Sequence, residues 1–358
     1  MRKYISIICA AIMMVSLLCA CGNTAPVTSE TSENTDTIAA TSSTVETEAT
    51  ASETSVETSG DKLQIVTTIF PEYDWVMSIL GENSDAAEVT MLLDNGVDLH
   101  SYQPTAEDIM KISTCDVFIY VGGESDEWVD DALKEATNKD MIVIDLLDVL
   151  ADEIKEEEVV EGMEAEDEEG EDGDSEEEEI EYDEHVWLSL SNAEKICNKI
   201  TEALVSVDPA NKDVYDKNFV DYSQKLSSLN EQYKEVVEGA STKTLLFGDR
   251  FPFRYMVDDY GLSYYAAFVG CSAETEASFE TITFLAGKVD ELSLSSIMTI
   301  EGKDHKIAET IRDNTKTKDQ NILTLDSMQA TTSEDVANGT TYLSVMEGNL
   351  EVLKEALK

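Results

Sequence analysis

Residues 63–93 read LQIVTTIFPEYDWVMSILGENSDAAEVTMLL. This stretch decides the fold class, because two runs rich in β-branched residues, 63–70 and 86–93, flank a segment with apolar residues at helical spacing. A strand, a helix and a second strand in this order are typical of parallel strands joined by crossover helices. The same alternation continues through residues 106–150. We therefore predict an α/β lobe with a mostly parallel sheet flanked by helices.

A second alternating series begins at TKTLLFG, residues 242–248, and continues to the end of the sequence. The chain is thus predicted to form two α/β lobes, over residues 61–207 and 240–358. Between them, residues 208–239 keep apolar positions at helical spacing, with Pro209 near the start and Gly239 at the end. We predict that this segment is one long, rigid helix that joins the lobes.

Residues 1–20 are predicted to be a signal peptide, because Arg2 and Lys3 precede an apolar core and small residues. The segment LCAC resembles a bacterial lipobox, in which Cys21 is lipidated and becomes the mature N-terminus; the alternative is an ordinary cleavable signal. Residues 21–60 are then predicted to be a disordered tether, since 18 of the 39 residues in 22–60 are Ser or Thr and none is aromatic. Three cysteines follow Cys21, and an odd number argues against a disulfide framework.

The net charge of −52 argues against binding to nucleic acid and leaves cations as plausible ligands. Acidic residues are densest in an insertion, 151–184, where they make up 21 of 34 residues. Like charges at this density repel one another, so we predict a disordered, solvated loop. The alternative is a loose collector of cations beside a binding cleft.

Four residues with metal-ligating side chains, two in each predicted lobe, are expected on the strand-end side of the sheets. His100 follows the run that ends at residue 93, His185 opens HVWLSL, and Glu301 and Asp326 end two strands of the second lobe. Ligand groups in parallel α/β lobes project from loops at the carboxyl ends of strands. Two imidazoles and two carboxylates that meet between the lobes would suit Zn²⁺ and also admit Mn²⁺.

Four short blocks of sequence carry a resemblance to a known family. They are GVDLHSYQP (96–104), DEHVWL (183–188), TIEG (299–302) and LTLDS (323–327). With these blocks the chain resembles the zinc/manganese solute-binding lipoproteins of bacterial ABC importers, a family that includes adhesin-B-like receptors. The resemblance implies two α/β lobes joined by a long helix, with the metal between them, and His100, His185, Asp326 and Glu301 as ligands.

The same resemblance implies a function and its partners. It predicts an extracytoplasmic receptor, lipid-anchored to a bacterial cell membrane, that binds zinc and hands it to the permease and ATPase subunits of an ABC importer. The receptor is expected to act as a monomer and not as an enzyme. The alternatives are a manganese or iron receptor of the same family, a surface adhesin that depends on metal, and a metallohydrolase.

The chain departs from the family where a third histidine ligand is usual. In RFPFRYMVDDYGL (250–262), Arg250 stands at that position, and a guanidinium has no free lone pair for a cation. Either Asp249 reaches the metal, or water completes the shell, or Arg250 pairs with an acid of the site. The segment CSAETEAS (271–278) offers Cys271 or Glu274 as extra ligands, with a helix cap as the alternative role. His305 matches no ligand position and is predicted to be a solvated surface residue.

Overall fold

The computed structural model describes residues 62–164, 181–272, 276–302 and 304–358. The predicted signal peptide, Cys21 and the whole of the predicted tether lie outside these residues, as do Glu274 and the middle of the acidic insertion.

The first lobe is built on a sheet of four parallel strands in the order β2-β1-β3-β4. The strands are β1 (Leu63–Thr67), β2 (Ala87–Met91), β3 (Val117–Tyr120) and β4 (Ile142–Asp145). Ile65 pairs with Val89 on one side and with Val117 on the other. Consecutive residues of β3 are buried, as expected for a parallel sheet that helices cover on both faces.

The second lobe repeats this design with four parallel strands in the order β6-β5-β7-β8. The strands are β5 (Thr244–Phe251), β6 (Ser263–Val269), β7 (Ser296–Ile300) and β8 (Asn321–Leu325). Both sheets follow the alternation of β-branched runs and helical periodicity in the sequence. The predicted fold class, two α/β lobes with parallel sheets and a long helix, is confirmed.

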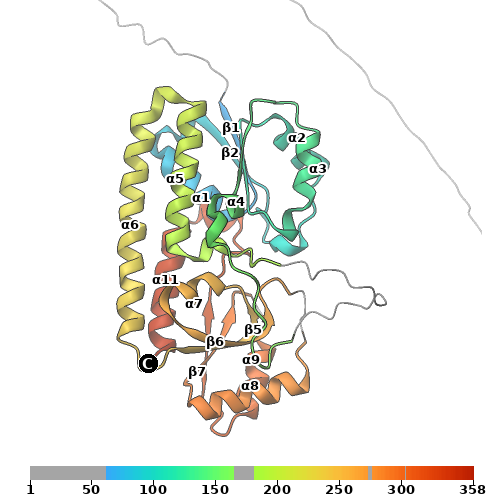
Figure 1. The fold of residues 1–358 in the computed structure, drawn as a ribbon, viewed down its shortest axis with the longest axis vertical. Coiled ribbons are helices and arrows are strands. Elements are labelled where there is room, and N and C mark those ends of the chain that lie inside the picture. Colours follow the sequence, from blue (N-terminus) through green and yellow to red (C-terminus); the bar gives the residue numbers. More distant parts are fainter. Residues whose placement is uncertain (1–61, 165–180, 273–275, 303) are drawn as a thin grey trace, which may run out of the picture. The chain divides into compact units, whose positions relative to one another are not determined.

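Helices cover the sheets and join the two lobes (Figure 1). They are α1 (Phe70–Leu80), α2 (Ala106–Thr114), α3 (Trp128–Lys134), α4 (Leu146–Leu150), α5 (Leu190–Val207), α6 (Lys212–Glu238), α7 (Arg254–Tyr260), α8 (Phe279–Leu292), α9 (Lys306–Asn314), α10 (Ser333–Ala337) and α11 (Tyr342–Ala356). One face of the second sheet packs against α8 and α9, with Phe268, Leu285 and Ile311 in a separate apolar cluster. The other face belongs to the larger core that also contains the first sheet.

The long helix α6 holds the two lobes together. Its 27 residues span roughly 40 Å, and it contacts α1 and α5 of the first lobe as well as α7 and α11. The C-terminal helix α11 in turn reaches the first lobe, since the backbone N–H of Tyr342 donates to Asp74 Oδ2 at 3.1 Å. The hydroxyl of Tyr233 on α6 donates to the carbonyl of Met346 at 2.6 Å. The end of the predicted second lobe therefore packs across the boundary drawn at residue 240.

The structure differs from the prediction at the acidic insertion. Its two arms, 151–164 and 181–184, are paired with each other through an antiparallel bridge between Glu156 and Tyr182. The first arm also lies along β6, where the backbone N–H of Glu164 donates to the carbonyl of Ala267 at 2.9 Å. Backbone hydrogen bonds and cations, such as Arg254 beside Glu158 at 3.4 Å, offset the repulsion that suggested a wholly solvated loop.

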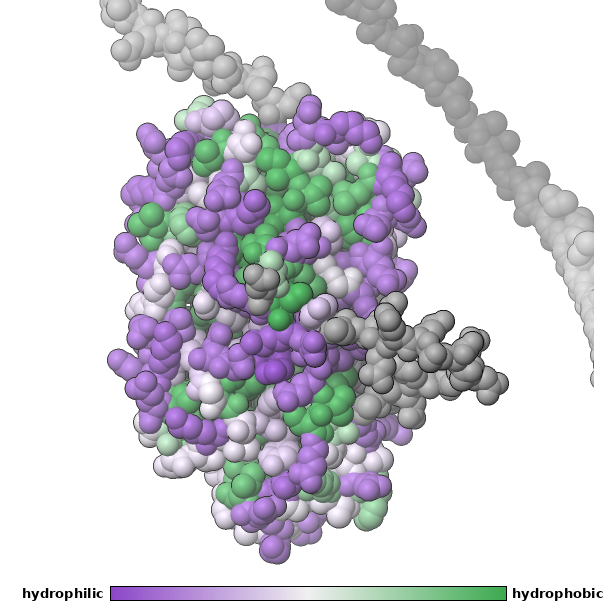
Figure 2. Space-filling model, in the orientation of Figure 1, coloured by the Kyte–Doolittle hydropathy of each residue, from purple (hydrophilic) through white to green (hydrophobic). Residues whose placement is uncertain are grey.

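The face of the molecule shown in Figure 2 is mainly hydrophilic. On the face shown in Figure 2, hydrophilic residues cover most of the molecule and hydrophobic residues form patches between them. Among the helices of the described residues, none combines the length and the apolar character that a membrane span requires.

Candidate metal centre

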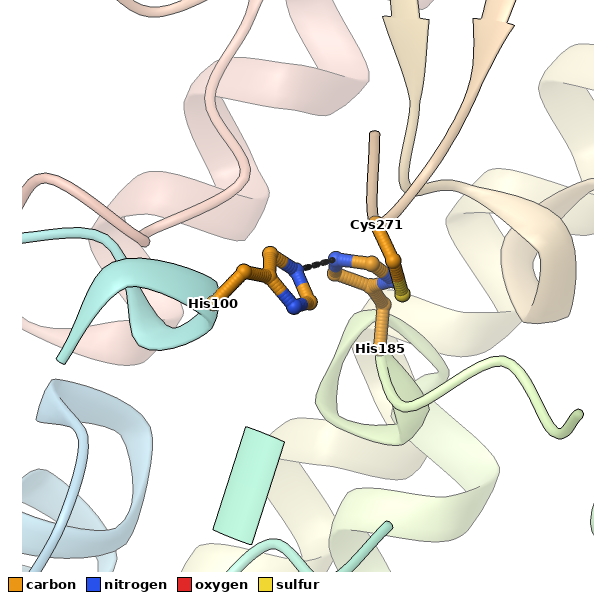
Figure 3. Close-up of side chains that lie close together, drawn as sticks. All are labelled: His100, His185 and Cys271. Carbon is orange, nitrogen blue, oxygen red and sulfur yellow. Dashed lines mark hydrogen bonds between the residues drawn. The ribbon is translucent and has the colours of Figure 1, made fainter. Parts of the chain in front are cut away.

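The two predicted histidine ligands meet between the lobes. His100 Nε2 lies 3.2 Å from His185 Nε2, and the ring centroids are 5.2 Å apart (Figure 3). The His185 side chain is fully buried and that of His100 is 11% exposed. Residues 85 positions apart in the sequence thus bring two ring nitrogens together in a site that is largely shielded from water.

A tight turn after β2 positions His100. Asp98 begins the 3₁₀ helix Leu99–Ser101, and its Oδ1 accepts a hydrogen bond from the backbone N–H of His100 at 3.1 Å. The ring is held through Nδ1, which lies 2.7 Å from Ser125 Oγ and 3.5 Å from Glu184 Oε2. With its proton on Nδ1, the ring keeps the lone pair of Nε2 free for a metal.

His185 is oriented in the same way by the end of the acidic insertion. Asp183 Oδ1 accepts hydrogen bonds from the backbone N–H of His185 at 2.9 Å and, with that proton on Nδ1, from its ring at 3.1 Å. Asp183 is itself anchored, because its carbonyl accepts a 2.8 Å hydrogen bond from the Tyr255 hydroxyl. A carboxylate on Nδ1 is the usual partner of a metal-binding histidine, and it leaves Nε2 facing His100.

The electrostatic setting favours a neutral His100. Burial, followed by the neighbouring His185, lowers the pKa of His100 to about 3. The ring is therefore unprotonated at neutral pH, as metal binding requires. Burial also raises the pKa of Glu184, which faces His100 Nδ1.

Cys271 joins the pair from the second lobe. One ligand atom from each of His100, His185 and Cys271 lies within 4.8 Å of the other two, and we call these residues the His-His-Cys group. Cys271 follows β6 and Gly270, where a Cβ atom would come within 2.9 Å of His185 Cε1. The strand end can pass this close to the ring only because residue 270 has no side chain. Burial, then the charges of Glu184 and Asp183, raises the pKa of the Cys271 thiol.

The segment 271–278 was considered as a source of an extra metal ligand or as a helix cap, and different residues of the segment suit these two roles. Ser278 caps α8, since its Oγ accepts a hydrogen bond from the backbone N–H of Thr281 at 3.1 Å. Cys271, at the other end of the segment, lies beside the histidines. Helix capping and a place at the centre are therefore compatible.

The structure does not bring the predicted carboxylates into the His-His-Cys group. Glu301 Oε2 accepts from the backbone N–H of Ser327 at 2.6 Å, and Oε1 accepts from the backbone N–H of Gln329 at 3.0 Å. Asp326 Oδ1 accepts from the backbone N–H of Met328 at 2.8 Å. Burial, with the charge of Glu301, raises the pKa of Asp326 to about 6. These two acids mainly hold the turn after β8, and as metal ligands they stay predictions.

Asp249 and Arg250 are engaged elsewhere as well. Asp249 Oδ1 accepts from the backbone N–H of Arg250 at 3.0 Å, and Oδ2 accepts from that of Ile300 at 3.3 Å. Arg250 forms an ion pair with Asp98, the residue that starts the turn of His100. Of the three arrangements considered at this departure from the family, the structure has the one in which Arg250 pairs with an acid. Although burial opposes it, the hydrogen bond and charge of Arg250 hold the pKa of Asp98 below its usual value.

An open cleft of about 690 Å³ adjoins the centre. Asp98 and Ser101, which flank His100, line it together with Ser272, which follows Cys271. Arg250 also lines this cleft, so the interlobe ion pair lies at its wall. The third histidine, His305, is the N-cap residue of α9, as its predicted place at a helix start implies. Its side chain is half-buried, and Nδ1 has no hydrogen-bond partner among the described residues, so the residue is only partly solvated.

Sequence reasoning missed the residues that orient the rings, although two of them were within the quoted block DEHVWL. Asp183 and Glu184 stand directly before His185, and an acid beside a candidate histidine is a signal that could have been used. Ser125, which follows β3, had no comparable signal because polar residues are common after strands.

The molecule has two α/β lobes, each with a parallel sheet, and a long helix joins them. A buried pair of imidazoles lies between the lobes. This combination defines a two-lobe solute-binding receptor. Residues 65–356 match the protein family described as zinc-uptake complex component A, periplasmic, and the chain belongs to that family. The predicted resemblance is thereby confirmed.

Individual relatives agree with this assignment. The chain is 31% identical over 303 residues to the high-affinity zinc uptake system protein ZnuA of Bacillus subtilis, covering 85% of this chain and 90% of that protein. It is 32% identical over 300 residues to the zinc-binding lipoprotein AdcA of Streptococcus pneumoniae, covering 82% of this chain. The match spans only 56% of the length of AdcA.

Solved structures show the same architecture. The Zn(II)-bound ZnuA-like domain of Streptococcus pneumoniae AdcA has a TM-score of 0.64 and 28% identity, over 83% of this chain and 99% of that domain. The metal-dependent lipoprotein YcdH of Bacillus subtilis has a TM-score of 0.67 and 26% identity, over 83% and 99% of the two chains.

Proposed function

We propose that this protein is the extracytoplasmic receptor of a bacterial ABC importer, and that it captures Zn²⁺ between its lobes and delivers it to the permease. This is a receptor and not an enzyme. Its metal ligands include His100 and His185, and the thiol of Cys271 lies beside them. The names of relatives support zinc, since AdcA is a zinc-binding lipoprotein and ZnuA a zinc uptake protein.

One observation carries the proposal, namely the spacing of the two free ring nitrogens. Two nitrogens bound to one tetrahedral zinc, each at about 2.0 Å, lie roughly 3.3 Å apart. His100 Nε2 and His185 Nε2 are 3.2 Å apart, and each ring is held through its other nitrogen. The spacing of the pair thus matches that of two corners of a zinc tetrahedron.

The remaining parts of the proposal concern the ends of the chain and its partners. Residues 1–20 are proposed as a signal peptide, Cys21 as the lipidated anchor and 21–60 as the tether to the membrane. The lobes are proposed as 61–207 and 240–358, with the linking helix at 208–239. The protein acts as a monomer that docks on the permease of an importer whose ATPase subunits drive transport. Manganese remains the alternative cargo, although a pair of imidazoles suits zinc better than a hard cation.

Zinc affinity measured by competition with a chelator tests the proposal. His100→Ala and His185→Ala should each weaken zinc binding by at least about 100-fold, or roughly 2.7 kcal/mol, because each removes a metal ligand. His305→Ala is the matched control, since this histidine lies outside the His-His-Cys group. Zinc affinities that are equal in all three variants would remove the basis of the proposal.

A further inference from the structure

Arg250 stands where the sequence resemblance implies a third histidine ligand, which leaves the metal's third position to another group. Arg250 cannot bind a cation and is committed to Asp98. Asp249 and Glu301 of the second lobe direct both oxygens at backbone N–H groups, and Asp326 directs Oδ1 at one. The group that does lie beside both histidines is the thiol of Cys271.

The approach of Cys271 to the histidines is built into the strand that carries it. Gly270 lies so close that an added Cβ would be 2.9 Å from His185 Cε1 and 3.0 Å from the carbonyl oxygen of Phe251. The backbone N–H of Cys271 also faces Glu157 Oε1 at 3.4 Å, on the first arm of the acidic insertion. The second arm ends in Asp183 and Glu184, which orient the two rings. The same insertion therefore contacts all three members of the group.

The surroundings of the sulfur are suited to a cation. Glu157, Asp183 and Glu184 bring carboxyl groups to the centre, and Arg250, the nearby cation, is held by Asp98. A divalent ion bound at the sulfur would be compensated by these acids. The other two cysteines of the described residues, Cys115 and Cys197, are buried and lie outside the group.

We propose that Cys271 is the third protein ligand of the metal, as a thiolate, and that its sulfur makes the centre select zinc and softer ions against manganese. This inference rests on the proposed function and specifies its cargo. As the zinc–sulfur bond forms, the S–H proton leaves to solvent, so that atoms and charge balance. Thiolate favours Zn²⁺ and softer ions, whereas Mn²⁺ prefers carboxylate, carbonyl and water oxygens.

Cobalt spectroscopy tests the sulfur ligand directly. Co²⁺ bound to thiolate gives a sulfur-to-metal charge-transfer absorption in the near ultraviolet, which a site of nitrogen and oxygen ligands lacks. The full-length protein loaded with Co²⁺ should show this absorption. Cys271→Ala should abolish it, and the matched control Cys197→Ala should retain it. A cobalt-loaded wild-type protein without the absorption overturns the proposal, whatever the stability of the variants.

Affinities for two metals test the selectivity. Cys271→Ala should weaken zinc binding by at least about tenfold, while it changes manganese binding by less than about threefold. Cys271→Asp, which offers an oxygen ligand, should lower the ratio of zinc to manganese affinity by about 100-fold. Equal losses for both metals in Cys271→Ala would contradict the selectivity.

The two proposals fail in different ways. If the wild-type protein binds zinc tightly, His100→Ala loses it and Cys271→Ala does not, the receptor function stands and the sulfur ligand is wrong. If the wild-type protein binds neither zinc nor cobalt, both proposals are wrong.

Discussion

The first and second lobes were predicted to contribute equally to the metal centre, but their candidate ligands are used differently. In the first lobe, His100 and His185 are each held through Nδ1, and their Nε2 atoms face each other at 3.2 Å. In the second lobe, both oxygens of Glu301 and of Asp249 accept hydrogen bonds from backbone N–H groups, and Asp326 accepts one through Oδ1. The imidazoles of the first lobe thus keep one nitrogen for a metal, whereas the carboxylates of the second lobe already hold backbone N–H groups.

This difference shows why position at a strand end is a weak criterion for a ligand. Loops after parallel strands leave backbone N–H groups unpaired, and a carboxylate satisfies two or three of them at once. An imidazole has two nitrogens, so one can be fixed by a neighbour while the other stays available. A residue at the right end of a sheet is thus a ligand only when some of its hydrogen-bonding capacity is left over.

Outside the His-His-Cys group, zinc affinity should depend most on Asp183, the carboxylate that holds the His185 ring. In Asp183→Asn the ring loses a charged acceptor for Nδ1–H, and zinc affinity should fall by about 10- to 100-fold, the usual cost of removing the outer partner of a metal-binding histidine. Chelator competition measures it. Glu158→Gln is the matched control, because Glu158 is on the same insertion but pairs with Arg254. A loss below threefold in Asp183→Asn would mean that the ring is oriented without its carboxylate.

Both lobes and both histidines could be predicted from sequence because the signals are local. The period of the β-branched runs indicates strands, and the two blocks around His100 and His185 are specific. The sequence could not single out Cys271 as a ligand. Its position beside the histidines depends on the close approach of Gly270 to the ring of His185, which lies 85 residues earlier in the chain. The path of the two arms of the acidic insertion could not be predicted either, since it depends on backbone hydrogen bonds to distant residues such as Ala267 on β6.

The arrangement of hydrogen bonds around Glu301 and Asp326 was equally out of reach. Which backbone N–H groups need an acceptor at the end of β8 is decided by the turn through Ser327, Met328 and Gln329. Met328 has a positive φ of 64°, a backbone conformation that the sequence pattern does not predict for a methionine. The sequence shows an acid at a strand end, but the backbone N–H groups that this acid accepts from are brought to it only when the chain folds.

The pH dependence of zinc binding distinguishes a thiol ligand from a carboxylate ligand, because the two groups release protons in different pH ranges. Burial and the acids Glu184 and Asp183 raise the pKa of Cys271, so the free thiol is protonated at neutral pH. Binding as thiolate should release one proton, and zinc affinity should rise by about tenfold per pH unit between pH 7 and 8. His100, whose pKa burial lowers to about 3, adds no proton in this range.

Calorimetry in buffers of different ionisation enthalpy counts the protons. Wild-type protein should release one more proton per zinc than Cys271→Ala at pH 7.5. If Asp326 were the ligand instead, the release would be confined to the region below about pH 6, since burial and Glu301 raise its pKa to about 6 and it is ionised above that value. Proton release that is the same in both proteins at pH 7.5, and rises only on acidification, would assign the third position to the carboxylate.

The smallest effect on zinc is expected for the carboxylate that is most fully engaged. Glu301 accepts from the backbone N–H groups of Ser327 and Gln329 and from the Ser327 hydroxyl, so Glu301→Gln replaces a charged acceptor by a neutral amide at three hydrogen bonds. The free energy of unfolding should fall by roughly 2 kcal/mol, as for hydrogen bonds to a charged group, while zinc affinity should change by less than threefold. Denaturant unfolding without metal and chelator competition measure the two quantities. Glu309→Gln, an exposed acid on α9, should change neither. A loss of zinc affinity in Glu301→Gln as large as that in His185→Ala would show that the second lobe does supply a carboxylate to the metal.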